Sequence, residues 1–212
     1  MCAEPTVKIN RQQLNIQLSA NGLLQTKAKD YVNKNFFIPA VKEMKQQFEQ
    51  HPITQEIEGG IEADNISNTL KGDFPSDEGK NLFSFIGFQN GDTPIDDIRY
   101  YLDPVNPSGP KLKLTNINKG KLQYTFEVTP PSLEEIHKNT PMPWADGLSW
   151  VKRIETGIPN LGKFLNKIGI KGSRSGGGIQ VKKSLRDGKY APRSYMTQII
   201  NKFIKRATAK PE

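Results

Sequence analysis

The sequence is poor in the residues that form disulfides, metal sites and membrane spans. Cys2 is the only cysteine among 212 residues, which excludes an intrachain disulfide framework and fits folding in a reducing compartment. One cysteine and two well-separated histidines do not give the ligand spacing of a zinc site. No stretch approaches the roughly 18 apolar residues of a membrane helix, and residues 1–30 contain no apolar run of signal-peptide length. We therefore expect a protein made in the cytosol that spans no membrane.

Catalytic groupings are equally scarce. The carboxylate pairs Asp96–Asp97 and Glu134–Glu135 stand in the first turns of predicted helices, where they complement the helix dipole without any acid–base role. His51 and His137 each stand near a predicted helix end, where a positive group is favourable, so a structural role accounts for them. The sequence therefore predicts no enzyme, with no catalytic residue, no cofactor-binding residue, no metal ligand and no cofactor.

What the sequence has instead is an uneven distribution of charge. Residues 163–212 carry 13 Lys and Arg against 2 Asp and Glu, whereas residues 1–162 carry 17 against 20. Like charges at this density repel one another unless a partner compensates them. The last quarter therefore predicts a contact surface for DNA phosphate or for an acidic protein surface, with a solvated basic tail as the alternative. The residues expected to make this contact are Arg174, Lys182, Lys183, Arg186, Lys189 and Arg193.

The two tryptophans, Trp144 and Trp150, complete the expected contact set. They flank the start of a predicted helix and could stack on nucleic-acid bases, given the basic segment that follows. Anchoring of a core or of a subunit interface is the commoner use of tryptophan and the one we favour. Gly176–Gly178 lacks the Lys-Ser/Thr ending of a phosphate-binding loop, so it is interpreted as a flexible hinge or a turn.

Hydrophobic periodicity predicts an α+β fold, in which a small, mainly antiparallel sheet packs with two long helices and a C-terminal helix. The first long helix covers residues 23–48, with Pro39 expected to kink it or divide it in two. The second is expected over residues 145–168. Ser194 is expected to cap the last helix, whose apolar face includes Met196 and Phe203.

The clearest predicted strand is Asn81–Phe88, a run of apolar and aromatic residues. Residues 111–128 alternate with period two around a turn at residues 118–120, which predicts a β-hairpin. We expect this hairpin and the strand to share one sheet. If Phe126 is fully buried in it, Phe126→Ala would cost about 3 kcal/mol. Short helices are expected from Thr93 and from Ser132, each with a helix-starting residue in place.

The sequence shows no boundary that would separate two cores, so residues 21–206 are expected to form a single domain. Residues 1–20 contain the alternating Leu14, Ile16 and Leu18, which indicates an N-terminal arm or an edge strand. Residues 207–212 are expected to be a C-terminal tail.

Two groups of stretches occur in an order that resembles virion proteins of tailed bacteriophages. The first group is His51-Pro-Ile-Thr-Gln-Glu-Ile-Glu-Gly-Gly-Ile, Ser67-Asn-Thr-Leu and Asn81-Leu-Phe-Ser-Phe-Ile-Gly-Phe. The second is Trp150-Val-Lys-Arg-Ile-Glu-Thr-Gly-Ile, Arg174-Ser-Gly-Gly-Gly-Ile-Gln and Tyr195-Met-Thr-Gln-Ile-Ile. Within that group, the chain is most similar to neck or tail-completion proteins, which are related to the minor tail proteins of lambda-like phages. The resemblance covers residues 20–205 as an order of elements, with stretched spacing and without a diagnostic motif.

This resemblance implies a virion structural protein without catalytic residues, made in the host cytoplasm. It also implies a homo-oligomeric ring at the head–tail junction, with other connector and tail proteins as partners and DNA in the channel. The alternative is a basic nucleic-acid-binding protein that uses residues 163–210, and a small enzyme is the least favoured interpretation.

Overall fold

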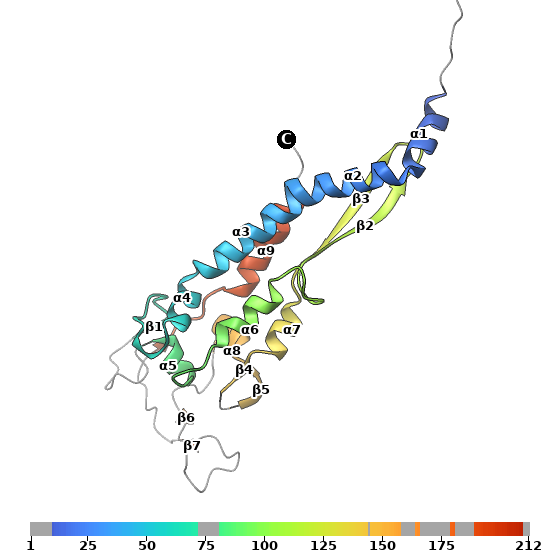
Figure 1. Ribbon diagram of the computed structural model, residues 1–212. Helices are drawn as coiled ribbons and strands as arrows, with labels where there is room; N and C mark the ends of the chain where they lie inside the picture. The colour runs from blue at the N-terminus through green and yellow to red at the C-terminus, as the bar shows by residue number, and fades with distance from the viewer. Residues whose placement is uncertain are drawn as a thin grey trace, which may run out of the picture.

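A computed structural model shows an elongated α+β protein, in agreement with the predicted fold class. The body is built on α3 (Ile38–Glu49) and α9 (Met196–Ala207), which lie side by side, with short helices and strands around one end of the pair (Figure 1). The N-terminal helices and a long hairpin project beyond the other end. The structure describes residues 10–71, 81–143, 145–157, 164–165, 179–180 and 189–209.

The predicted first long helix is confirmed, and it is divided as Pro39 requires. α2 (Gly22–Val32) is followed by a π-helical turn, η1 (Asn33–Phe37), and then directly by α3. Proline has no N–H to donate, so the α-helical hydrogen-bond register cannot run through Pro39 unchanged. The π turn just before it, in which each N–H reaches one residue further back than in an α-helix, takes up the change.

The predicted C-terminal helix is also confirmed, with its apolar face against α3. Met196 and Phe203 are buried there. Aromatic contacts join the two helices, because the ring of Phe37 meets that of Phe203 edge-on with centroids 6.3 Å apart. Just before α9, the Tyr195 ring stacks on Phe48 at 6.2 Å. This seam between the start of the chain and its end is the centre of the core.

The predicted cap of α9 is wrong. Tyr195, not Ser194, occupies the cap position, and its side chain makes no capping hydrogen bond. The Glu155 carboxylate accepts hydrogen bonds from the N–H groups of Tyr195 and Thr197 at 2.9 and 2.8 Å, and from the Thr197 hydroxyl. A carboxylate at a helix N-terminus also meets the positive end of the helix dipole. A residue 40 positions away in sequence thus replaces the local hydroxyl cap.

Three short helices start where local signals place them. α4 (Pro52–Glu58) begins with its proline and runs into a single 3-10 turn, η2 (Gly60–Glu62). α6 (Pro94–Tyr101) starts after Thr93, although the Thr93 side chain makes no capping bond. α7 (Leu133–Lys138) has the predicted cap, because the Ser132 hydroxyl accepts from the Glu135 N–H at 3.2 Å.

The predicted strand at residues 81–88 is wrong, because most of it forms the helix α5 (Leu82–Ile86). The Asn81 side chain caps this helix by accepting from the Ser84 N–H at 3.0 Å. Gly87 ends the helix with a left-handed φ of 101°. Because α5 is buried on several sides, its apolar residues do not recur at helical spacing along one face. A short, uniformly apolar sequence does not distinguish a buried strand from a buried helix.

The predicted second long helix is wrong as well. Its span begins as strand β5 (Ala145–Ser149), continues as α8 (Trp150–Thr156) and includes strand β6 (Phe164–Leu165). The Ser149 hydroxyl caps α8 by accepting from the Lys152 N–H, and the helix ends at Gly157, whose φ is 86°. A glycine at positive φ ends the helix because other residues adopt that conformation at a cost.

The described strands form two-stranded antiparallel pairs rather than one continuous sheet. The predicted common sheet for residues 81–88 and the hairpin is therefore wrong. The pairs are β1 (Leu70–Lys71) with β8 (Lys189–Tyr190), β2 (Lys111–Asn118) with β3 (Gln123–Thr129), β4 (Pro141–Met142) with β5, and β6 with β7 (Ile179–Gln180).

Residues 11–20, expected as part of an arm or an edge strand, form the helix α1 (Arg11–Ala20). The Asn10 side chain accepts from the N–H groups of Gln12 and Gln13 and caps it. Three alternating apolar residues are too short a pattern to exclude a helix. The strand interpretation is therefore wrong.

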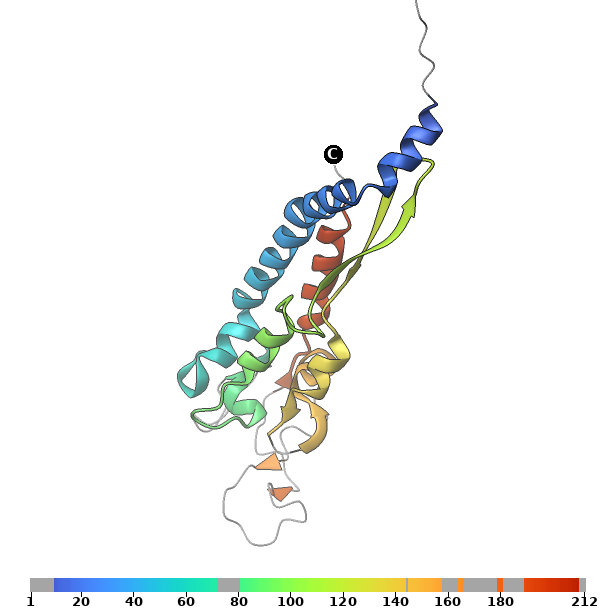
Figure 2. The same cartoon turned by 45° about the vertical axis from the view of Figure 1, so that its right-hand side comes forward.

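The hairpin is confirmed, but the condition that Phe126 is fully buried is not met. β2 and β3 pair from Lys111↔Thr129 to Asn118↔Gln123, with an irregularity between Leu114 and Asn116. Phe126 is only half-buried, because β3 is exposed on one face and only partly covered on the other, where the hairpin projects from the body (Figure 2).

We expect Phe126→Ala to lower the free energy of unfolding by about 1 kcal/mol, well below the value for a fully buried ring. Urea denaturation followed by circular dichroism measures this difference. A loss comparable to that of a core phenylalanine such as Phe48→Ala would contradict the observed half-burial.

Candidate assembly interface

We call residues 10–38 and 111–129 the arm. They project from the body, except at the base of the arm, where Phe37 is buried in the core (Figures 1 and 2). α1 buries only Ser19, and α2 buries none of its residues within the described structure. At the far end, the Asn15 amide donates to the Gly120 carbonyl at 3.2 Å and so joins α1 to the hairpin turn. Helices of this length are marginal in water without tertiary packing. The arm therefore has little within its own chain to stabilise it.

Large apolar side chains are exposed along the arm. Leu23 is 60% exposed, Tyr31 57% and Ile38 54%, and Leu14 and Ile16 are also exposed. A monomer leaves single apolar residues at its surface, but a series of them along an unsupported helix is typical of an interaction site. The arm is also basic, because each of its two segments carries four Lys or Arg and a single acidic residue.

The opposite end of the molecule is acidic. Residues 51–64 and 81–103, which we call the acidic end, carry eight Asp and Glu and a single basic residue, Arg99. Arg99 forms ion pairs with three carboxylates. Its guanidinium lies 2.5 Å from Glu58 and 2.9 Å from Asp96, which belong to the acidic end, and 2.7 Å from Glu49 at the end of α3. The hydrogen bond to Glu49 is the largest of the interactions that raise the pKa of Arg99. The one cation here is thus already neutralised.

Other carboxylates of the acidic end remain available. Glu62, Asp64, Asp92 and Asp97 are exposed and form no ion pair with any described residue. Exposed apolar residues also occur here, with Ile61 at 45% and Ile66 at 51%.

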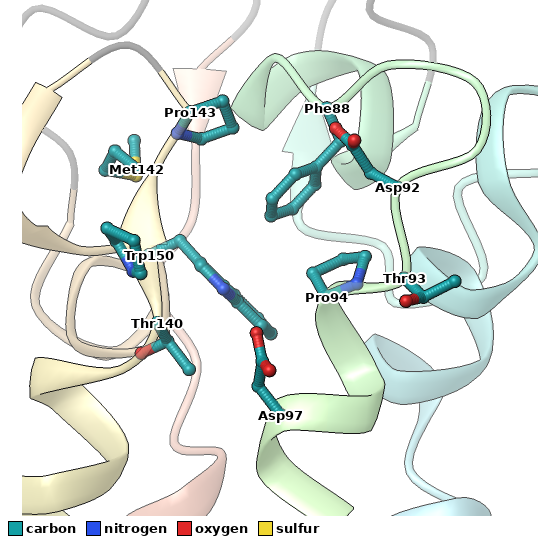
Figure 3. A pocket seen from close by; sticks show the side chains of 10 residues that line it. Phe88, Asp92, Thr93, Pro94, Asp97, Thr140, Met142, Pro143 and Trp150 are labelled. Carbon is teal, nitrogen blue, oxygen red and sulfur yellow. The ribbon is translucent and has the colours of Figure 1, made fainter.

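A pocket of about 420 Å³ opens beside this end, where α6, α8 and β4 meet (Figure 3). Apolar side chains form much of its wall, and the Phe88 and Trp150 rings meet edge-on with centroids 5.8 Å apart. Asp92 and Asp97 add carboxylates to the lining. Burial and then the neighbouring Asp96 raise the pKa of Asp97. Such a pocket accepts an apolar or a cationic side chain, since aromatic faces and carboxylates both attract cations.

Two carboxylates that the sequence analysis did not single out are structural. Glu56 is completely buried on α4, and its oxygens accept from the Ser67 N–H at 2.7 Å and the Leu82 N–H at 2.6 Å. Glu155 caps α9 through the backbone N–H groups at its start. In the sequence, burial of Glu56 could have been predicted from its position between Ile53 and Ile57 on the apolar face of α4. Both carboxylates accept hydrogen bonds from backbone N–H groups, as a structural acceptor does.

His51 has a structural role different from the one expected. His51 is the N-cap of α4, and its Nδ1 accepts from the Ile53 N–H at 3.2 Å, which requires a neutral ring. Burial, followed by the charges of Lys202 and Arg193, lowers the pKa of His51. Burial likewise lowers the pKa of His137 in the last turn of α7. His51, which follows the end of α3, therefore does not carry the positive charge expected there, whereas His137 lies in the last turn of a helix as expected.

Most of the predicted basic contact set falls outside the described residues, namely Arg174, Lys182, Lys183 and Arg186, together with Trp144. Lys189 is placed by its backbone, which pairs with Lys71 in the β1–β8 pair. Arg193 is exposed and lines a second pocket of about 330 Å³ next to His51. Of the six basic residues, the structure thus describes the side chain of Arg193 alone, and the grouping of the six stays a prediction.

Trp150, the remaining member of the set, is in the core. It is 1% exposed and opens α8 against Phe88. A ring enclosed in this way cannot stack on nucleic-acid bases, so the core interpretation of Trp150 is the correct one.

Comparisons with protein-family models, curated proteins and solved structures gave no match to the chain. Over the residues that the structure describes, no helix is long and apolar enough to cross a membrane. In the same residues, the His, Cys, Asp and Glu side chains form no group that could hold a metal ion.

Proposed function

We propose that this chain is a structural subunit that acts by assembling with other protein subunits through its arm. The observation that carries the proposal is the contrast along α2, which buries none of its described residues yet exposes Leu23 and Tyr31. Burial of such side chains at an interface supplies the stabilisation that the arm lacks in the single chain.

The specific form of the proposal is a neck or tail-completion subunit in the virion of a tailed bacteriophage. Its support is the order of the sequence stretches from His51 to Ile200. A projecting arm beside a well-packed body is consistent with a subunit that contacts several neighbours, and a non-enzymatic role agrees with the structural use of Glu56 and Glu155.

A basic nucleic-acid-binding protein is the second candidate. It is favoured by the 13 Lys and Arg against 2 Asp and Glu in residues 163–212. Phosphate binding through these residues predicts an affinity for DNA that falls steeply with salt.

We expect the double variant Leu23→Ser/Tyr31→Ser to lose self-assembly while its body stays folded. Both side chains are exposed in the single chain, so the substitution removes interface area without opening a cavity in the core. Sedimentation velocity over a range of protein concentrations measures the assembly, and circular dichroism measures the fold.

The matched control is Val105→Ser, which removes an apolar side chain that is 90% exposed but lies outside the arm. This control should assemble like the unmodified chain. A chain that stays monomeric at every concentration, or an arm variant that assembles normally, would contradict the proposed function.

A further inference from the structure

The arm presents one stripe in which apolar and basic side chains alternate. Leu23, Lys27, Tyr31, Lys34 and Ile38 follow one another at spacings of three and four residues along α2, η1 and the start of α3. Positions so spaced lie on one side of a helix. All five side chains are exposed. A partner for this stripe needs apolar side chains interspersed with carboxylates.

The acidic end offers that combination within one short segment. Ile61 and Ile66 are exposed there, and the exposed carboxylates of Glu62 and Asp64 lie between them in sequence. No cation of the described structure forms an ion pair with either carboxylate. The segment thus matches the arm stripe both in apolar content and in the sign of its charge.

The two surfaces lie far apart on one molecule. In both views the arm extends from one end of the body, while η2 and α5 lie at the other end (Figures 1 and 2). The arm stripe of a chain therefore cannot reach its own acidic end, whereas it can reach that of a second copy.

Resting on the proposed function, we infer that the arm stripe of one copy docks on residues 58–66 of a second copy. This contact joins two different surfaces, so each added copy still presents one free arm and one free acidic end. Such head-to-tail contacts close into a ring when the rotation between copies permits, and otherwise continue as a filament.

Charge reversal on each surface tests this contact. The arm variant is Lys27→Glu/Lys34→Glu, and the end variant is Glu62→Lys/Asp64→Lys. Each variant alone places like charges across every contact, so each should be monomeric in sedimentation velocity. An equal mixture of the two restores opposite charges at every contact and should assemble as the unmodified chain does.

The matched control is Lys138→Glu/Lys152→Glu, which changes the net charge as the arm variant does but alters two exposed lysines of the body. It should assemble normally. All charge reversals fall on exposed side chains, and circular dichroism should show the same helix content in every variant.

Four results would overturn the inference. Assembly by both variants alone, or failure of their mixture, shows that the copies meet through other surfaces while the proposed function stands. If Lys27 and Lys34 govern binding to DNA or to anionic vesicles but not sedimentation, the arm stripe serves those ligands. If the unmodified chain never assembles, the proposed function fails together with this contact.

Discussion

The Trp150→Ala variant is expected to lose about 3–5 kcal/mol of its free energy of unfolding, because it removes a large and fully enclosed ring. Trp150 is 1% exposed, opens α8 directly after β5, and packs edge-on against Phe88. Removing the indole leaves a cavity, and α8 cannot close it without moving relative to β5 and Phe88. A loss of this size is a large share of the stability of an ordinary domain.

Urea denaturation monitored by circular dichroism measures the effect, and Trp150→Phe is the matched control. Phenylalanine keeps an aromatic ring against Phe88 and should retain much of the stability. If Trp150→Ala unfolds at the same urea concentration as the unmodified chain, the burial of this ring is wrong.

The Glu56→Gln variant is expected to lose about 2–3 kcal/mol, although it changes the side-chain volume very little. The Glu56 oxygens accept from the backbone N–H groups of Ser67 and Leu82. A glutamine has only one oxygen, so its NH₂ group must face one of these donors. One buried N–H then loses its partner and the other loses a charged acceptor, both of which are costly inside a protein.

The matched control is Glu62→Gln, which makes the same chemical change at an exposed carboxylate and should shift stability by no more than about 0.5 kcal/mol. Hydrogen exchange locates the effect, because the Ser67 and Leu82 amides should exchange faster in the Glu56 variant. Equal stability of the two variants would show that Glu56 does not hold residue 67 and α5 to α4.

These two substitutions act on the body, whereas the proposed assembly acts through the arm. Trp150→Ala and Glu56→Gln should therefore lower stability without preventing assembly under conditions where the body is folded. The arm variants should do the reverse, because their side chains are exposed and contribute little to the single chain.

Local signals were enough to predict the elements with a long, regular pattern. Helical periodicity with Pro39 predicted the divided helix of α2, η1 and α3, and the apolar face of residues 196–204 predicted α9. Alternation around the turn at residues 118–120 predicted the β2–β3 hairpin. In each case the pattern repeats over many residues. Only a helix, or only a strand, then places all of the apolar side chains on one continuous face.

Elements that are uniformly buried or capped from a distance depend instead on contacts between remote parts of the chain. Residues 82–86 form a helix because their apolar run is enclosed and capped by Asn81, whose amide also donates to the carbonyls of Ile61 and Ala63. Glu155 caps α9 across 40 residues of sequence. The hydrogen bonds of Asn81 to residues 61 and 63, and those of Glu155 to the start of α9, join residues distant in the chain, so no local pattern encodes them. The Asn81 cap of α5, in contrast, joins residues close in sequence. Which exposed residues come to share a surface also depends on the tertiary structure.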